Sequence, residues 1–159
     1  MHKIKLAYEV KHTIAAPLKE VFAFFSDMHN IYACTSDVVD FEVIDKHTSK
    51  WQLVTKQELG ICFTPEYTMF YSYEPDTKIS WRSINGNVQI NAILSLSSND
   101  ENSTQVTVHE EVSFMLSVSA IMSKVIKPIA NIEARNDMLN VLKLAGNKLV
   151  ERSQQDSIT

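Results

Sequence analysis

Cysteine, glycine and basic side chains are scarce in this chain, and each shortage excludes a class of protein. The two cysteines, Cys34 and Cys62, are too few for a disulfide framework and form no C-x-x-C pair. We expect both to be buried thiols in a reducing cytoplasm. The three glycines form no P-loop, no G-x-G-x-x-G turn and no G-x-S-x-G nucleophile elbow, so nucleotide-binding and serine-hydrolase motifs are lacking.

Positive charge and long apolar runs are lacking as well. The net charge is −4 and the basic residues are scattered, so we expect no nucleic-acid partner. No apolar run reaches the ~18 residues of a membrane span, and "MHKIKLAYEV" is strand-like rather than a signal peptide, so we expect no integral membrane segment. The five histidines lack the spacing of metal ligands, so we expect no metal and no cofactor.

The chain does contain enough apolar material for one domain with a substantial core. Of its 159 residues, 45% are hydrophobic, and these include six Met, seven Phe, five Tyr and two Trp. No repeat, linker or low-complexity tract divides the sequence. We expect one domain over residues 1–152, followed by a frayed tail over residues 153–159.

The apolar pattern changes its period along the chain. Residues 4–14 alternate as a strand does, Pro17 begins a helix, and a second short helix covers about residues 28–34. From Val38 the period is two, and "NGN" at 85–87 predicts a tight hairpin turn. After residue 117 the apolar residues have helical spacing and lie at 121, 125, 129, 132, 139, 142 and 149. Pro128 marks either a kink in this helix or the end of a short lead-in helix.

This order predicts an α+β protein with one strand, two short helices, six further strands and a long helix. Successive strands joined by short turns form an antiparallel sheet of about seven strands, which needs an apolar cover. The C-terminal helix is the only large candidate for that cover. One helix cannot fill the whole concave side of a curved sheet, so we expect a cavity of ~300–1,000 Å³ between them.

Three stretches have an order and spacing that resemble a known superfamily: "HTIAAPLKEVFAFFSD", "ISWRSINGNVQINAILSLSSNDENSTQVTVHEEVSF" and "MLNVLKLAGNKLVER". They are similar to the I-x-A-P strand–helix segment, the I-x-W-x-S strand with its paired long strands, and the closing helix of the START-like (SRPBCC) superfamily. The resemblance implies the helix-grip fold, in which a curved sheet wraps around the C-terminal helix. Within the superfamily it points to the polyketide cyclase/dehydrase and coenzyme-Q-binding branch.

One carboxylate interrupts the apolar face of "QVTVHEEVSF", residues 105–114. Val106, Val108, Val112 and Phe114 share one face of this strand, and Glu110 lies on the same face. Glu110 either points into a cavity or reaches solvent through a bulge or near the strand end. In a cavity, burial would raise its pKa and let it bind a ligand or act as a general base.

Arg135 and Asn136 lie between apolar positions of the C-terminal helix. Arg135 either projects into the cavity and pairs with Glu110, or lies along the helix edge with its guanidinium in water. The candidates for catalytic residues are Glu110, Arg135 and Tyr67. The candidate ligand-binding residues are Trp51, Leu53, Phe63, Tyr67, Met69, Tyr71, Trp81, Ile90, Ala92, Leu94, Val108, Glu110, Val112, Ile132, Arg135, Asn136 and Leu139.

Three functions remain open for such a protein. The leading one is binding of a hydrophobic small molecule, such as a lipid, polyketide or quinone-like compound, by a carrier, sensor or chaperone. The alternative is an aromatase/cyclase-like enzyme in which a pocket acid or base moves a proton. The third is a protein-interaction module with a packed interior. Whether the protein forms a homodimer is left open by the sequence.

Overall fold

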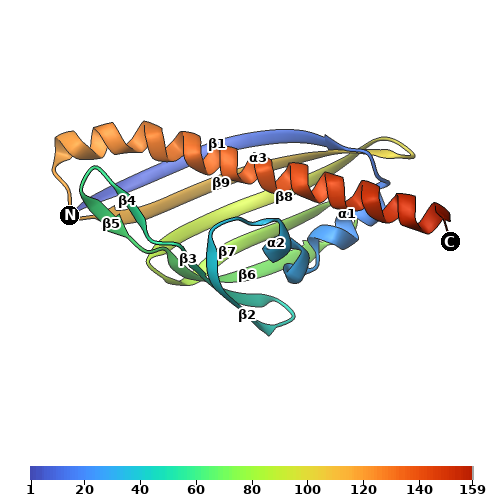
Figure 1. Cartoon of the computed structure of the whole chain (residues 1–159), viewed down its shortest axis with the longest axis horizontal. Helices are drawn as coiled ribbons and strands as arrows, with labels where there is room; N and C mark the ends of the chain where they lie inside the picture. Colours follow the sequence, from blue (N-terminus) through green and yellow to red (C-terminus); the bar gives the residue numbers. More distant parts are fainter. Residues whose placement is uncertain (159) are drawn as a thin grey trace.

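The computed structural model describes residues 1–158 and combines a curved antiparallel sheet with three helices (Figure 1). The predicted α+β helix-grip fold is confirmed. Two short strands, β4 and β5, form a separate hairpin beside the seven-stranded sheet. In chain order the elements are β1 (His2–Ile14), α1 (Leu18–Phe25), α2 (Met28–Cys34), β2 (Val38–Asp45), β3 (Thr48–Leu53), β4 (Lys56–Glu58), β5 (Ile61–Phe63), β6 (Glu66–Glu74), β7 (Lys78–Gly86), β8 (Val88–Asp100), β9 (Ser103–Leu116) and α3 (Ala120–Ile158).

The seven-stranded sheet has the order β1-β9-β8-β7-β6-β3-β2, and every neighbouring pair is antiparallel. Alternation along each strand produces its buried face. In β1, for example, Leu6, Tyr8 and Val10 are buried and the residues between them are exposed. Strands β8 and β9 pair in one unbroken register over residues 88–98 and 104–114, so each residue in this stretch keeps its face of the sheet.

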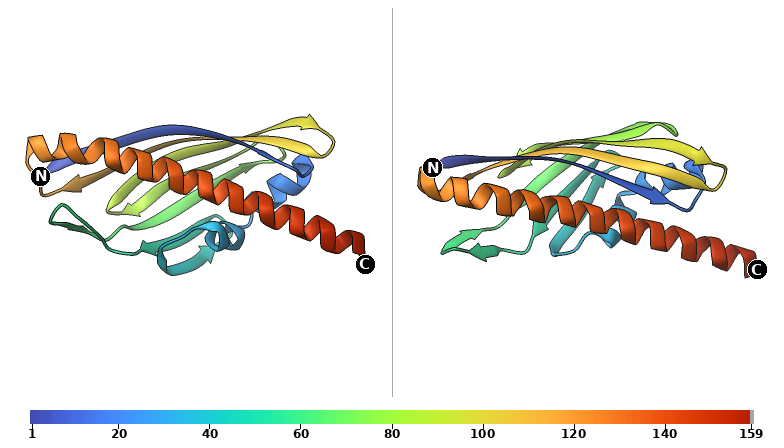
Figure 2. Two further views of the ribbon diagram at one scale, coloured as in Figure 1. Left: turned by 45° about the horizontal axis from the view of Figure 1, so that its top comes forward. Right: turned by 90° about the horizontal axis from the view of Figure 1, so that it is seen from above.

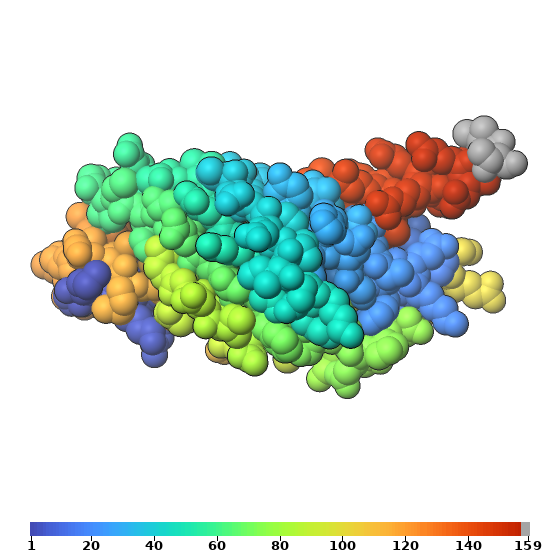
Figure 3. All heavy atoms as spheres, turned by 90° about the horizontal axis from the view of Figure 1, so that it is seen from below, coloured from blue at the N-terminus to red at the C-terminus, as the bar shows by residue number. Residues whose placement is uncertain are grey.

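Helix α3 crosses the buried face of the sheet obliquely and packs on β1 (Figure 2). It is one continuous helix with Pro128 inside it, so a separate lead-in helix is excluded. The helix continues through residues 153–158, which belong to the expected frayed tail, and residue 159 lies outside the described residues. The C-terminal part of α3 projects past the sheet and the short helices (Figure 3).

The inward face of α3 differs from the predicted apolar stripe. Ile121 and Ile132 belong to that stripe but are 78% and 61% exposed. Ala134 and Met138 pack against the core instead, in line with the buried Leu142. The prediction followed the largest apolar side chains, whereas Ala130 and Ala134 are among the inward residues in the first half of α3. The later stripe positions Leu142 and Leu149 are buried, as predicted.

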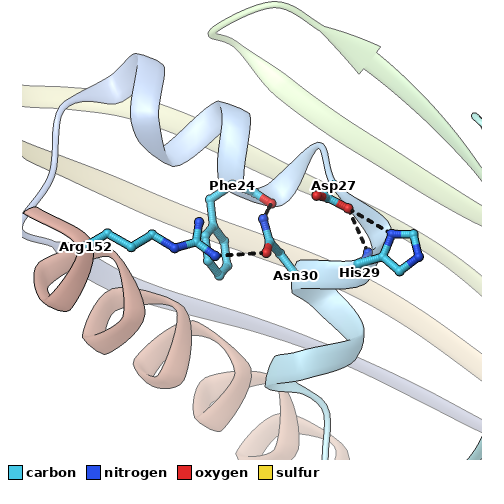
Figure 4. A network of polar contacts seen from close by, with 5 residues as sticks. All are labelled: Phe24, Asp27, His29, Asn30 and Arg152. Atoms are coloured by element: carbon cyan, nitrogen blue, oxygen red, sulfur yellow. Dashed lines mark hydrogen bonds and ion pairs between the residues drawn. The ribbon is translucent and has the colours of Figure 1, made fainter. Parts of the chain in front are cut away.

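The short helices hold the C-terminal half of α3 in place (Figure 4). The guanidinium of Arg152 lies over the Phe24 ring, 5.0 Å from its centroid, and donates a hydrogen bond to Asn30 Oδ1 at 3.2 Å. Asn30 in turn donates to the carbonyl oxygen of Phe24 at 3.0 Å. Asp27 caps α2 by accepting a hydrogen bond from the backbone N–H of His29 at 2.9 Å. These contacts tie the C-terminal half of α3 to both short helices.

The connection between β7 and β8 is wider than the two-residue hairpin predicted from "NGN". Pairing of these strands ends at Arg82 and Asn91, and Gly86 pairs with Tyr67 of β6 instead. Gly86 has a φ of +113°, and a Cβ there would lie 2.6 Å from the Cα of Tyr67. Both the backbone conformation and the close approach of β6 therefore require glycine at this position.

Candidate functional site

A cavity of about 290 Å³ lies between the buried face of the sheet and α3. Side chains from β1, β3 and β6–β9 form its floor, and the inward face of α3 forms its roof. Most of this wall is aliphatic or aromatic, as expected of a site that binds an apolar molecule. The polar groups of the wall are few, and they fall into one buried cluster and one group at the rim.

The buried cluster lies on a row of residues that runs across five neighbouring strands. The register places Tyr71, Trp81, Ala92, Glu110 and Tyr8 side by side, on β6, β7, β8, β9 and β1 in that order. All five are buried. Because residues directly opposite one another share a face of the sheet, four large side chains of this row gather around the small Ala92.

Glu110 points into the cavity and is held there by two neutral donors. Its side chain is 8% exposed. The Tyr8 hydroxyl donates to Oε1, and Trp81 Nε1 donates to Oε2 at 3.1 Å. Burial raises the pKa of the Glu110 carboxyl, and the hydrogen bonds from Tyr8 and Trp81 offset part of this effect. The alternative in which a bulge lets Glu110 reach solvent is therefore wrong.

Ala92 makes this geometry possible although it does not line the cavity. It separates Trp81 from Glu110 in the row, so these two residues lie two strand spacings apart, about 9–10 Å. Their side chains meet only because the indole and the carboxylate reach toward each other over the Ala92 methyl group. A larger residue at position 92 would occupy the path of the indole.

A second aromatic row lies beside the first. The register aligns Phe41, Trp51 and Tyr67 on β2, β3 and β6. The Trp51 and Tyr67 rings are stacked with centroids 6.4 Å apart, and Phe41 lies 4.6 Å from Trp51. Trp51 Nε1 donates to Ser49 Oγ at 2.8 Å. Trp51 and Tyr67 of this row line the cavity, while the Phe41 ring is tilted by 58° to Trp51 behind them.

The Tyr67 and Tyr71 hydroxyls add polarity without charge. Burial raises the pKa of Tyr71 to about 12 and raises the pKa of Tyr67 as well, with the nearby Glu110 charge adding to both effects. Burial also raises the pKa of Tyr8, and the adjacent Glu110 adds to this. All three tyrosines are therefore neutral hydrogen-bonding groups at ordinary pH.

The rim of the cavity is acidic. Glu133 and Asp137 of α3 lie there with Asp37, which follows α2, and Lys56 of β4. Lys56 Nζ lies 3.6 Å from Glu133 Oε2, an ion pair that links α3 to the β4–β5 hairpin across the opening. Partial burial raises the pKa of Asp137, an effect that Lys56 opposes and Asp37 reinforces.

The structure brings most of the candidate ligand-binding residues together around the cavity. Those that line it are Trp51, Leu53, Phe63, Tyr67, Met69, Tyr71, Trp81, Ile90, Leu94, Glu110 and Val112. Ala92 and Val108 are buried in the sheet and do not line it.

The candidates on the C-terminal helix lie elsewhere. Ile132, Arg135 and Asn136 are exposed on α3, and Leu139 packs against the core without lining the cavity. Arg135 therefore does not pair with Glu110. The helix residues that do line the cavity are Ala130, Glu133, Ala134, Asp137, Met138, Val141 and Leu142.

Tyr8 is the most important residue that the sequence analysis missed. Its place on the apolar face of the first strand was readable from the alternation, but its contact with Glu110 depends on β1 lying beside β9. Those two residues are 102 positions apart in the chain, and no local pattern indicates which strands become neighbours. Leu142 on the inward face of α3 belonged to the predicted stripe, but Ala130 and Ala134 were missed because alanine carries little hydrophobic signal.

Other chemistry has little support in the described part of the chain. Within residues 1–158, no group of three or more His, Cys, Asp or Glu side chains is placed to hold a metal ion. Cys34 is buried and Cys62 is exposed, so the expectation of a buried thiol is wrong for Cys62. None of the helices described here is long and apolar enough to span a membrane.

Solved structures match the chain over nearly its whole length, although no family model and no curated protein sequence does. A protein from Thermus thermophilus has a TM-score of 0.74 at 14% identity, covering 92% of this chain and 99% of its own. The Zhui aromatase/cyclase from a Streptomyces species has a TM-score of 0.73 at 12% identity, covering 94% and 96%. A START superfamily protein from Mycobacterium smegmatis has a TM-score of 0.70 at 12% identity, covering 91% and 97%.

These likenesses define the class of architecture. The chain has the fold of START superfamily proteins, as its sequence motifs predicted. At such low identity the comparison concerns the fold alone. What the protein does has to be argued from the cavity itself.

Proposed function

We propose that this protein binds a small, largely apolar molecule in the cavity between the sheet and α3. The observation that carries this proposal is the cavity of about 290 Å³, which is walled mainly by aromatic and aliphatic side chains. Apolar surface that faces water is unfavourable, so a ligand that covers this wall is favoured by removing the surface from water. The START superfamily fold supports the same function.

The driving force for such binding is removal of apolar surface from water. Each Å² of apolar surface buried contributes about 25 cal/mol. The aromatic row of Trp51 and Tyr67 offers a flat face for a ring, and Glu110, Tyr67 and Tyr71 supply polar atoms that orient it.

Within this class of function we predict a lipid, polyketide or quinone-like ligand and a role as carrier, sensor or chaperone. We also predict a cytoplasmic location and a homodimer.

Native mass spectrometry of the protein as purified tests the proposal. We expect a 1:1 complex with a small molecule, or uptake of one molecule of menadione, a compact neutral quinone, by the bare chain. Retention of the bare mass in both conditions would contradict the proposal. Extraction and accurate mass of any co-purified molecule would identify its chemical class.

A cyclase-like enzyme is the second candidate, and one observation favours it. The Glu110 carboxyl faces the cavity with a pKa that burial raises, which suits an acid or base that moves a proton at neutral pH. The Zhui aromatase/cyclase shares the fold. Loss of turnover of a reactive polyketide in Glu110→Gln, with binding retained, would support this role. Because the interior is not fully packed, the protein-interaction module has the least support.

A further inference from the structure

The charges around the cavity are unbalanced. Four carboxyl groups line it, those of Asp37, Glu110, Glu133 and Asp137, and Lys56 is the one basic side chain among the described residues that do so. Lys56 is engaged with Glu133 at the rim, and its own side chain is 45% exposed. The cavity therefore has a formal excess of three negative charges over positive ones.

Glu110 is the innermost of these groups, and its charge has no protein counter-ion. Both of its contacts are with neutral donors, the Tyr8 hydroxyl and Trp81 Nε1. Two donors aimed at a carboxylate satisfy two of its roughly four lone pairs and leave the others free toward the cavity. A buried carboxylate without a cationic partner is unfavourable, so such a group either takes up a proton or is completed by a cation or a metal.

The surrounding wall suits an organic cation rather than a metal ion. The rings of Trp51, Tyr67, Tyr71 and Trp81 line the space around Glu110, and the negative faces of such rings attract ammonium groups. The Tyr67 hydroxyl makes no hydrogen bond with any described residue and is available to accept one from a protonated amine. A quaternary ammonium has no N–H and would be held by the rings and the Glu110 charge alone. A metal ion would need several further oxygen or nitrogen ligands, which these aromatic side chains do not supply.

We propose that the natural ligand of this cavity is an apolar molecule with a single positive charge, an amine or quaternary ammonium, which lies against Glu110 while its apolar body fills the space under α3. This inference rests on the proposed function and narrows the class of ligand. The acidic rim, with Glu133 and Asp137, attracts such a cation toward the opening. It also disfavours fatty acids and other anions.

Two probes of the same shape but different charge test the inference. Phenyltrimethylammonium and tert-butylbenzene are isosteric, and only the first carries a charge, which is independent of pH. Both are measured by displacement of a neutral fluorescent probe, N-phenyl-1-naphthylamine, at neutral pH and low salt. For the wild-type protein we expect the cation to bind at least ~10-fold more tightly than its neutral isostere.

The variants locate the source of that preference. Glu110→Gln keeps the shape of the side chain and removes its charge, so we expect it to weaken phenyltrimethylammonium binding by at least ~10-fold and to leave tert-butylbenzene within ~3-fold. Glu111→Gln removes a charge from the neighbouring residue on the solvent face, where the Glu111 side chain is 66% exposed. This matched control is expected to leave both affinities unchanged.

Failure of this inference and failure of the proposed function give different results. If tert-butylbenzene binds as tightly as the cation, or Glu110→Gln leaves the ratio unchanged, the cationic ligand is refuted and apolar binding stands. A protonated Glu110 that donates to a neutral ligand would give this result. If N-phenyl-1-naphthylamine itself shows no saturable binding, the proposed function fails and the inference falls with it.

Discussion

At the scale of single residues, Glu110 is the group on which the chemistry of the cavity depends. A strand with a period of two places it on the buried face, and an unbroken register with β8 keeps it there. Tyr8 and Trp81 then fix the carboxylate from two sides. The protein thus keeps an acidic group inside an apolar space, an arrangement that costs stability and is expected of a functional site.

The raised pKa of Glu110 makes a prediction about stability and pH. The folded protein binds the Glu110 proton more tightly than the unfolded chain does. The stability that this contributes is therefore fully present below the ordinary glutamate pKa, and it is lost as pH rises through the raised folded value. The groups that face Glu110, namely Tyr8, Tyr67, Tyr71 and Trp81, do not change charge in this window.

Thermal unfolding of Glu110→Gln between about pH 4 and pH 8 measures this effect. Because glutamine does not titrate, we expect the melting temperature of the variant minus that of the wild type to increase with pH. Glu111→Gln provides the control for a change of charge on the same strand. We expect the melting temperature of this variant minus that of the wild type not to increase with pH. A difference for Glu110→Gln that stays flat or falls with pH would contradict the burial assigned to this carboxyl.

At the scale of elements, the sequence predicted strands better than it predicted contacts between them. The inward direction of Glu110 and the aromatic floor with Trp51, Tyr71 and Trp81 followed from alternation within single strands. The hydrogen bond between Tyr8 and Glu110 could not be predicted in this way, because it depends on two strands from opposite ends of the sequence becoming neighbours. Local periodicity carries no information about strand order.

Helix α3 shows a second limit of the same kind. Large apolar residues occur on both sides of its N-terminal half, and the exposed Ile132 outweighed the inward Ala134 in the sequence pattern. Only contact with the sheet distinguishes the two faces. The same error made Arg135 a candidate for the cavity and for pairing with Glu110. Of the two placements that the sequence left open, the structure shows the other one, with Arg135 on the exposed side of α3.

The close contact between Gly86 of β7 and the backbone of β6 gives a prediction at this scale. Gly86→Ala places a methyl group against the β6 backbone in a left-handed conformation, so we expect the free energy of unfolding to fall by about 3 kcal/mol or more. Gly60 has a φ of +75° with nothing within 4 Å of its added Cβ, so Gly60→Ala is expected to cost only about 1 kcal/mol. Urea unfolding of both variants gives the comparison, and equal losses would contradict the close approach at Gly86.

At the scale of the whole molecule, one helix laid across a curved sheet leaves space that side chains do not fill. The sequence predicted this mismatch from the order of its elements, and the cavity of about 290 Å³ lies where the prediction placed it. Its size is slightly below the expected range of ~300–1,000 Å³. Phe25 and Ile31 of the short helices line the cavity, and the acidic rim lies at its opening.

The central claim is that this space accepts an apolar molecule, and fluorescence titration with N-phenyl-1-naphthylamine tests it most directly. Ala134 lies on the roof of the cavity, so Ala134→Phe places a ring inside it. Ala120→Phe makes the same change at the exposed start of α3. We predict saturable 1:1 binding by the wild type and by Ala120→Phe, and binding weakened at least ~10-fold in Ala134→Phe with its cooperative thermal unfolding retained. No saturable binding by the wild type, or equal binding by Ala134→Phe, would contradict the account.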